Sequence, residues 1–328
     1  MTAVLIAVIV LGVAFSFLNG VHDSSNVVAT MISSRAFSPP VALGVTAVAN
    51  FFGPIVLGVA VADTIGNQIV ASKSIGTGVI LVALVSAIVW DSLTWYLGLP
   101  SSSSHALIGG ILGAVVLGAG FGAIIVKGLM KVLVTLFISP IIGFLVGVIL
   151  LRLILFLSWK ATPRINGFFK RSQIVTGLAL ALSHGTNDAQ KTMGIIALAL
   201  VTSGYLKVFD IPLWVILLCA ASISVGTALG GWKLIRTLGG KFYKIRPVDG
   251  FAAQLASASV ILGASLIGGP VSTTQVVSSA IMGVGAAGRA SKVRWKVGQE
   301  IAMAWLLTIP ATALLAAGIY WVVGRFIP

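Results

Sequence analysis

The sequence predicts an all-α polytopic membrane protein, and three observations support this fold class. The 328 residues are 58% hydrophobic and only 9% charged, whereas about a quarter of the residues in an ordinary soluble domain are charged. The mean hydropathy is +1.11. Apolar stretches of about 20 residues, the length that a helix needs to cross a bilayer, recur along the whole chain. This composition excludes a soluble enzyme and a disordered chain, and Cys219, the only cysteine, excludes a disulfide scaffold.

The charged residues are mostly basic. The 21 Lys and Arg residues outnumber the 7 Asp and Glu residues, and the formal net charge is +14. Most of these charges fall in short connections between apolar stretches, where the positive-inside rule places them on the cytoplasmic face of a cell membrane. We therefore expect a lipid bilayer around the protein and no nucleic-acid partner. The N-terminal stretch lacks the positive segment of a signal peptide, so we expect it to be retained as a membrane segment.

Eight apolar segments define the predicted elements: 2–33, 41–62, 75–120, 132–157, 172–201, 212–231, 251–288 and 298–326. Polar runs at 19–23 and 183–188 interrupt the first and fifth segments, which we predict to be broken helices. Lipid tolerates non-helical backbone only where protein or a wet cavity satisfies it. The second, fourth, sixth and eighth segments are predicted to be plain helices.

The third and seventh segments are long enough for two helices each. The sequence PSSSSH at 100–105 interrupts the third segment, and PVSTTQ at 270–275 interrupts the seventh. Because Ser and Thr are preferred at helix N-caps, we predict two helical hairpins, each with a second helix that begins on its Ser/Thr run.

These features repeat in the same order along the chain. Gly20 and Asp23 recur as Gly185 and Asp188, and the Pro-x-hydroxyl run that begins at Pro100 recurs at 270. The chain is therefore predicted to hold two repeats, 1–157 and 172–328, joined by a cytoplasmic loop at 158–171. Each repeat makes an odd number of net crossings, so the second is inverted relative to the first, as in secondary transporters. The basic connections then place both termini outside.

The two Ser/Thr runs predict an anion site. A helix N-terminus carries unpaired N–H groups and roughly half a positive charge, and two hairpins that enter from opposite faces bring two such ends to one central point. Hydroxyl groups there add donors for a tetrahedral oxyanion. The candidate donors are Ser102, Ser103, Ser104, Ser272, Thr273 and Thr274. The alternative is that these hydroxyls only cap helices and bond back to carbonyls.

Two acids predict cation sites. A carboxylate near the bilayer centre is costly unless it is paired, yet Asp23 and Asp188 occupy equivalent positions in the two repeats. Carboxylates and backbone carbonyls are hard ligands that suit Na⁺. Side chains within reach along the chain are those of Asn19, Asn26, Ser183 and Asn187. Lys191 has two interpretations, an ion pair with Asp188 three residues earlier or a direct contact with the anion.

Four motifs, GVHDSSN at 20–26, LPSSSSHALIGG at 99–110, SHGTNDAQKTMG at 183–194 and GGPVSTTQ at 268–275, resemble the signatures of the inorganic phosphate transporter (PiT) family. The resemblance covers essentially the whole chain. It implies a secondary transporter with an inverted repeat, a homodimer, and symport of phosphate with Na⁺ or protons; some relatives carry sulfate. It assigns Asp23 and Asp188 to cation sites, and it assigns Ser103, Ser104, Thr273, Thr274, Asn26 and Gln190 to the phosphate site. Gln275 stands where the family usually has His.

The predicted function is import of inorganic phosphate by symport with cations, Na⁺ in preference to H⁺, without a cofactor. Moving a divalent phosphate inward against roughly 100 mV costs about 4.6 kcal/mol, and two monovalent cations would cancel this cost. A proton-coupled phosphate or sulfate permease and a passive anion channel remain alternatives. An intramembrane hydrolase that uses Ser104 and His105 is a rival of another class, but the chain lacks a G-x-S-x-G elbow around these residues.

Overall fold

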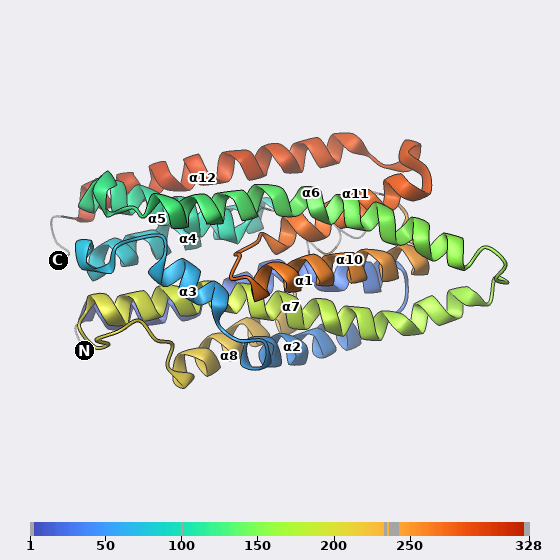
Figure 1. The fold of residues 1–328 in the computed structure, drawn as a ribbon, viewed down its shortest axis with the longest axis horizontal. Coiled ribbons are helices and arrows are strands. Elements are labelled where there is room, and N and C mark those ends of the chain that lie inside the picture. Colours follow the sequence, from blue (N-terminus) through green and yellow to red (C-terminus); the bar gives the residue numbers. More distant parts are fainter. Residues whose placement is uncertain (1–2, 100, 233–234, 236–242, 325–328) are drawn as a thin grey trace.

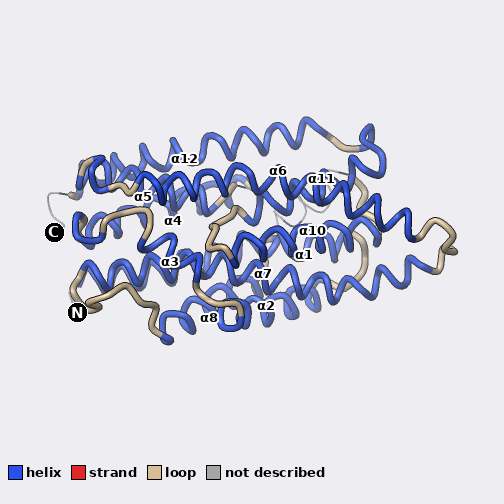
Figure 2. Tube along the Cα trace, in the orientation of Figure 1, coloured by secondary structure: helices blue, strands red, loops and turns tan. Residues whose placement is uncertain are grey.

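The computed structural model describes residues 3–99, 101–232, 235 and 243–324, and almost all of the described residues lie in a bundle of helices (Figures 1 and 2). The helices are α1 (Ala3–Ser33), α2 (Pro39–Val56), α3 (Ala60–Asn67), α4 (Thr77–Leu97), α5 (Ser103–Ala119), α6 (Val126–Leu157), α7 (Ile165–Thr202), α8 (Leu213–Leu229), α10 (Pro247–Leu266), α11 (Thr273–Arg289) and α12 (Trp295–Val323). Three short 3₁₀ turns and one isolated β-bridge, between Val70 and Ile124, complete the described secondary structure.

The helices confirm the all-α polytopic fold class. Six of them, α1, α2, α4, α6, α10 and α12, are long and apolar enough to cross a membrane. Large apolar side chains are exposed on the outward faces of these helices, among them Ile141 on α6 and Leu314 on α12, which are 61% and 75% exposed. Lipid rather than water is the solvent that such a surface requires.

Both predicted hairpins are present. Helices α4 and α5 form the first, and α10 and α11 form the second. The Ser102 hydroxyl caps α5 by accepting a hydrogen bond from the His105 backbone N–H at 3.2 Å, and the Ser272 hydroxyl caps α11 through the Gln275 N–H at 3.4 Å. Pro100, which was predicted to help break the first hairpin, lies outside the described residues.

The prediction that the first and fifth segments are broken helices is wrong. Helices α1 and α7 run without interruption through 19–23 and 183–188. The glycines in these motifs serve close packing instead. A Cβ on Gly20 would lie 2.2 Å from the Ile223 carbonyl oxygen of α8, and one on Gly185 would lie 2.4 Å from the Asn50 carbonyl oxygen of α2. Small residues let membrane helices approach this closely, and the polar neighbours face protein rather than lipid.

Two boundaries also differ from the sequence-based expectation. The segment 41–62 is not one helix, because α2 ends at Val56 and the short helix α3 follows after Gly58, whose φ of +86° favours glycine. The connection predicted at 158–171 is shorter, because α7 already begins at Ile165.

Helices from the two halves of the chain pack on one another reciprocally. Helix α1 packs against α8 while α7 packs against α2, and α5 packs against α12 while α11 packs against α6. The glycine contacts follow the same rule, since Gly53 of α2 meets Leu182 of α7 and Gly226 of α8 meets Phe17 of α1. Figure 1 shows that α1 and α7 begin at opposite ends of the bundle.

Two apolar clusters enclose the middle of the bundle. One contains the early part of α1 around Phe15 and the late part of α7 around Met193. The other contains the late part of α1 around Val28 and the early part of α7 around Leu180. The polar motifs of α1 and α7 lie between these clusters, where the tips of the hairpins meet them.

Candidate functional site

The candidate site is a buried polar cluster built from four helices. Helix α1 contributes Asn19, Asp23 and Asn26, α7 contributes Asp188 and Lys191, α5 contributes Ser103 and Ser104, and α11 contributes Thr273 and Thr274. None of these residues is more than 3% exposed. The cluster is therefore closed to water on all sides, and its polar groups are satisfied mainly by one another.

Lys191 connects the two hairpin tips. Its ammonium forms an ion pair with Asp188 on the same helix and donates to the Ser104 hydroxyl at 2.5 Å and to the Val271 carbonyl at 2.9 Å. Ser104 lies at the tip of the first hairpin and Val271 at the tip of the second. Both sequence-based interpretations of Lys191 therefore describe part of its environment: it pairs with Asp188 and also reaches the hydroxyl predicted to bind an anion.

The threonines of the second tip donate to the two acids. The Thr274 hydroxyl lies 2.9 Å from Asp23 Oδ1. The Thr273 hydroxyl lies between the carboxylates, 2.8 Å from Asp188 Oδ2 and 3.5 Å from Asp23 Oδ2. The Asn26 amide donates to the Thr274 hydroxyl at 3.0 Å. Two of the six hydroxyls predicted to bind an anion, those of Thr273 and Thr274, thus donate to carboxylates in this conformation.

The first tip has a different environment. The Ser103 hydroxyl donates to Asn19 Oδ1 at 2.8 Å, and the Ser104 hydroxyl donates to the Val271 carbonyl at 3.0 Å. The Asn19 Nδ2 group is buried and has no hydrogen-bond partner among the described residues. The site therefore combines an amide side and a carboxylate side, although the two hairpins have similar sequences.

The two acids converge on one place rather than two. The ligand atoms of Asp23, Asp188 and His184 all lie within 4.8 Å of one another. His184 Nε2 is 2.9 Å from Asp188 Oδ2, and His22 Nδ1 is 3.0 Å from Asp23 Oδ1. Two carboxylates meet one ammonium, that of Lys191, in this place, so a small cation beside the carboxylates would be favourable.

The remaining predicted residues support the site from its edges. The side-chain oxygen of Gln190, Oε1, accepts hydrogen bonds from the backbone N–H groups of Val61 and Ala62 at 2.7 and 3.2 Å. The Gln190 side chain therefore caps α3. Asn187 holds the loop of the second hairpin, because its amide donates to Ser265 Oγ at 2.8 Å and its oxygen accepts from the Val271 N–H at 3.2 Å.

Ser183 and the two N-cap serines are also used structurally. The Ser183 hydroxyl bonds back to the Ala179 carbonyl at 2.7 Å, and Ser102 and Ser272 cap their helices. The structure does not bring these three hydroxyls to the cluster around Lys191.

Two features were not predicted as parts of the site. His184 joins the acids because it precedes Asp188 by four residues on a continuous helix, a spacing that the expected helix break concealed. Asp91 on α4 is buried, and neither of its carboxylate oxygens has a hydrogen-bond partner among the described residues. It lines a cavity of about 310 Å³ together with His22.

The fold and the buried site define a multi-pass membrane protein of the transporter class rather than an enzyme. A family model described as "Phosphate transporter family" matches residues 19–316, and the chain belongs to this family, as its motifs indicate. It is 45% identical over 321 residues to a probable low-affinity inorganic phosphate transporter of Bacillus subtilis (strain 168), covering 97% of this chain and 96% of that protein.

Further comparisons agree with this assignment. The chain is 42% identical over 319 residues to a protein of the same description from Rhizobium meliloti (strain 1021), again covering 97% of this chain and 96% of the other. A solved structure described as "The sodium-dependent phosphate transporter" superposes with a TM-score of 0.90 at 25% identity, over 99% of this chain and 100% of the other.

Proposed function

We propose that the protein imports inorganic phosphate by symport with Na⁺ and that access to the central cluster alternates between the two sides of the membrane. The observation that carries this proposal is the convergence of both hairpin tips on Lys191. The descriptions of the relatives as phosphate transporters, and of the superposed structure as sodium-dependent, support the same substrate and coupling ion.

Phosphate would bind between the N-termini of α5 and α11. Both helices begin on hydroxyl residues, Ser103 with Ser104 and Thr273 with Thr274, so N–H groups, hydroxyls and helix dipoles face one place. Lys191 adds one ammonium. A site that combines a single full charge with many weaker donors binds an oxyanion and still releases it.

The hydrogen bonds indicate how cations would prepare the site. In the closed conformation the hydroxyls of Thr273 and Thr274 donate to Asp188 and Asp23. A Na⁺ ion bound by these carboxylates would compete for their oxygens. The threonine hydroxyls would then be free to donate to phosphate. Na⁺ would therefore bind before phosphate, and this order of binding would couple phosphate transport to Na⁺ transport.

Charge balance favours at least two cations. The two carboxylates of the cluster outnumber its one ammonium, and a divalent phosphate adds two negative charges in a region of low dielectric. Two Na⁺ ions would offset the added charge and would also cancel the cost of about 4.6 kcal/mol for moving the anion against roughly 100 mV.

The proposal includes the inverted repeat. Repeats at 1–157 and 172–328, with both termini outside, place α1 and α7 as equivalent helices that run in opposite directions, and Figure 1 supports this relation. The reciprocal packing of α1 on α8 and of α7 on α2 supports it further. Rocking of the hairpins against the plain helices would then expose the site alternately.

Uptake of radiolabelled phosphate into proteoliposomes tests the function. We expect accumulation above the external concentration when a Na⁺ gradient is imposed, and its loss in the Asp23→Asn and Asp188→Asn variants. Asp63→Asn is the matched control, because Asp63 lies on α3 and, among the described residues, its carboxylate bonds only to Asn67 and Gln68.

Other outcomes identify the alternatives. Accumulation driven only by a proton gradient would replace Na⁺ by H⁺ as the coupling ion, and equilibration without accumulation would indicate a passive channel. Competition by sulfate as strong as that by phosphate would overturn the substrate assignment.

A further inference from the structure

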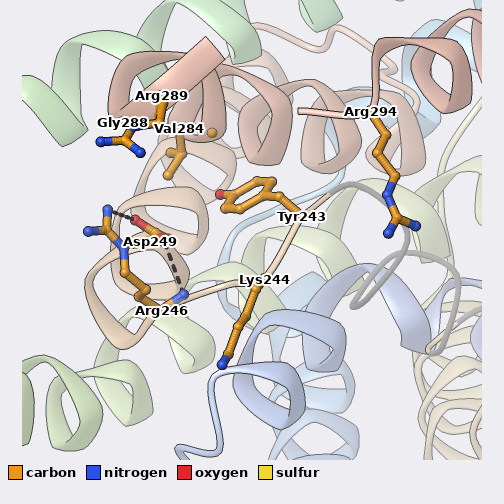
Figure 3. A pocket seen from close by; sticks show the side chains of 9 residues that line it. Tyr243, Lys244, Arg246, Asp249, Val284, Gly288, Arg289 and Arg294 are labelled. Atoms are coloured by element: carbon orange, nitrogen blue, oxygen red, sulfur yellow. Dashed lines mark hydrogen bonds and ion pairs between the residues drawn. The ribbon is translucent and has the colours of Figure 1, made fainter. Parts of the chain in front are cut away.

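A second site, with a basic lining, lies at the end of the bundle where α10 begins, α11 ends and α12 begins. Its cavity has a volume of about 680 Å³ and is lined on its polar side by Tyr243, Lys244, Arg246, Asp249, Arg289 and Arg294 (Figure 3). This volume lies within the range of small-molecule sites. The cavity is separate from the central cluster, because the 17 residues of α11 lie between them. At a rise of about 1.5 Å per residue, Thr273 and Arg289 are about 24 Å apart along this helix.

The cavity has an excess of positive charge. Arg246 is neutralised by Asp249, since its Nε and a terminal nitrogen donate to the two carboxylate oxygens at 2.9 and 2.8 Å. Lys244, Arg289 and Arg294 form no ion pair with any described residue. These three residues line the cavity without a carboxylate partner among the described residues, so the cavity has an excess of positive charge that would attract an anion.

A neutral donor completes the lining. The hydroxyl of Tyr243 is buried and has no hydrogen-bond partner among the described residues. Burial raises the pKa of this hydroxyl above its usual value, so the group stays protonated and can donate. In Figure 3 it points toward the side where the Arg246 and Arg289 guanidinium groups lie.

The backbone of α11 makes room for this tyrosine. A Cβ on Gly285 would lie 2.6 Å from the Tyr243 ring, and one on Gly288 would lie 3.5 Å from the Arg246 guanidinium. The two glycines therefore shape the wall against which the tyrosine and the arginine are held.

We propose that this cavity binds a phosphate group, with Arg289, Arg294 and Lys244 as charge partners and the Tyr243 hydroxyl as a neutral donor. Guanidinium groups match the oxygens of phosphate in geometry and charge. The phosphate group has two possible sources, the headgroup of an anionic phospholipid beside the bundle or free inorganic phosphate. The inference goes beyond the proposed transport and does not require it.

Binding to the purified full-length protein tests the proposal. The test variant is Arg289→Gln with Arg294→Gln; Arg246 is left intact because it pairs with Asp249. The control is Lys170→Gln with Arg171→Gln, which removes the same charge from exposed positions early in α7, at the same end of the bundle (Figure 1). Native mass spectrometry with dioctanoyl phosphatidylglycerol or dioctanoyl phosphatidylcholine reports lipid binding, and equilibrium binding of radiolabelled phosphate reports the free anion.

Each outcome supports or overturns the site. A loss of phosphatidylglycerol affinity of about tenfold or more in the test variant, with phosphatidylcholine and the control unchanged, would support a lipid headgroup. Loss of one bound phosphate per chain in the test variant, with the control variant unchanged, would support free phosphate. Unchanged binding of both probes, or equal losses in the test and control variants, would overturn the proposal. Neither readout measures uptake, so failure of the transport proposal is recognised separately.

Discussion

Gln275 and His105 face each other between the two hairpins, with their Nε2 atoms 3.3 Å apart. Gln275 is the third residue of α11 and His105 is the third residue of α5, so corresponding positions of the two hairpins are in contact. A pseudo-twofold axis that relates the halves would pass between these side chains. The residues that differ between the halves, such as Lys191 on α7 and Asn26 on α1, would then make the site asymmetric around that axis.

Removal of the Lys191 ammonium is expected to damage both stability and transport. Lys191→Met leaves the buried Asp188 carboxylate without its cationic partner, and breaking one side of a buried ion pair costs about 3–5 kcal/mol. We expect a lower unfolding temperature in detergent and no phosphate accumulation. The double variant Lys191→Met with Asp188→Asn should recover much of the stability but not the transport. Equal instability in the single and double variants would contradict a direct pairing.

The fold could be predicted largely from composition and hydropathy, because lipid imposes length and apolarity on each helix. The ends of α4, α5, α10 and α11 lie within a few residues of the predicted hairpin breaks. The starts of α5 and α11 were predictable because Ser102 and Ser272 cap these helices through N–H groups only three residues later in the sequence. The continuity of α1 could not be predicted. The sequence around Gly20 does not indicate whether this glycine interrupts a helix or lets a second helix pack closely against it. The close packing involves Ile223, about 200 residues away in the sequence.

The sequence predicts which residues form the site but not which hydrogen bonds they make with one another. Hydroxyls at helix N-termini and acids in apolar segments identify Thr273, Thr274, Asp23 and Asp188 from residue chemistry alone. That Thr273 lies between both acids is a tertiary relationship. The same holds for Gln190, whose contact with the N–H groups of α3 could not be foreseen because α3 itself was not predicted.

Close helix packing at the motif glycines predicts a strong effect of a single methyl group. Gly20→Ala and Gly185→Ala would each place Cβ against a backbone carbonyl, at 2.2 and 2.4 Å, and such overpacking costs about 1–3 kcal/mol. Gly44→Ala on α2 is the matched control, because its Cβ would meet no atom within 4 Å from any described residue beyond its own turns of helix. Thermal unfolding in detergent should separate the two classes, and equal unfolding temperatures would refute the packing role.

The Thr274 hydroxyl is expected to matter for phosphate and Na⁺ together. Thr274→Val keeps the shape of the side chain and removes its hydrogen bonds to Asp23 and Asn26. Each lost bond to a buried partner costs about 1–3 kcal/mol, so we expect the KM for phosphate to rise about tenfold or more and the Na⁺ dependence to shift. Thr274→Ser should restore both.

A control hydroxyl for this experiment is that of Ser257, which is buried and, within the part of the chain that the structure describes, bonds only to the Ala253 carbonyl of its own helix. Ser257→Ala should transport with an unchanged KM. If Thr274→Val behaves like Ser257→Ala, the threonine hydroxyl only satisfies local hydrogen bonds and the coupling proposed from its contact with Asp23 is wrong.

The same chemical change is expected to have opposite effects at two buried acids. Asp91 has no hydrogen-bond partner for either oxygen among the described residues, and a buried charge without a partner costs more than the neutral amide that would replace it. Asp91→Asn should therefore raise the unfolding temperature. Asp249→Asn should lower the free energy of unfolding by about 1 kcal/mol, and the unfolding temperature with it. The substitution weakens the two bonds from the Arg246 side chain, which is half exposed. Thermal unfolding of both variants checks the signs. If Asp91→Asn instead loses stability, and the loss depends on added Na⁺, a bound cation balances the Asp91 carboxylate and the predicted sign is wrong.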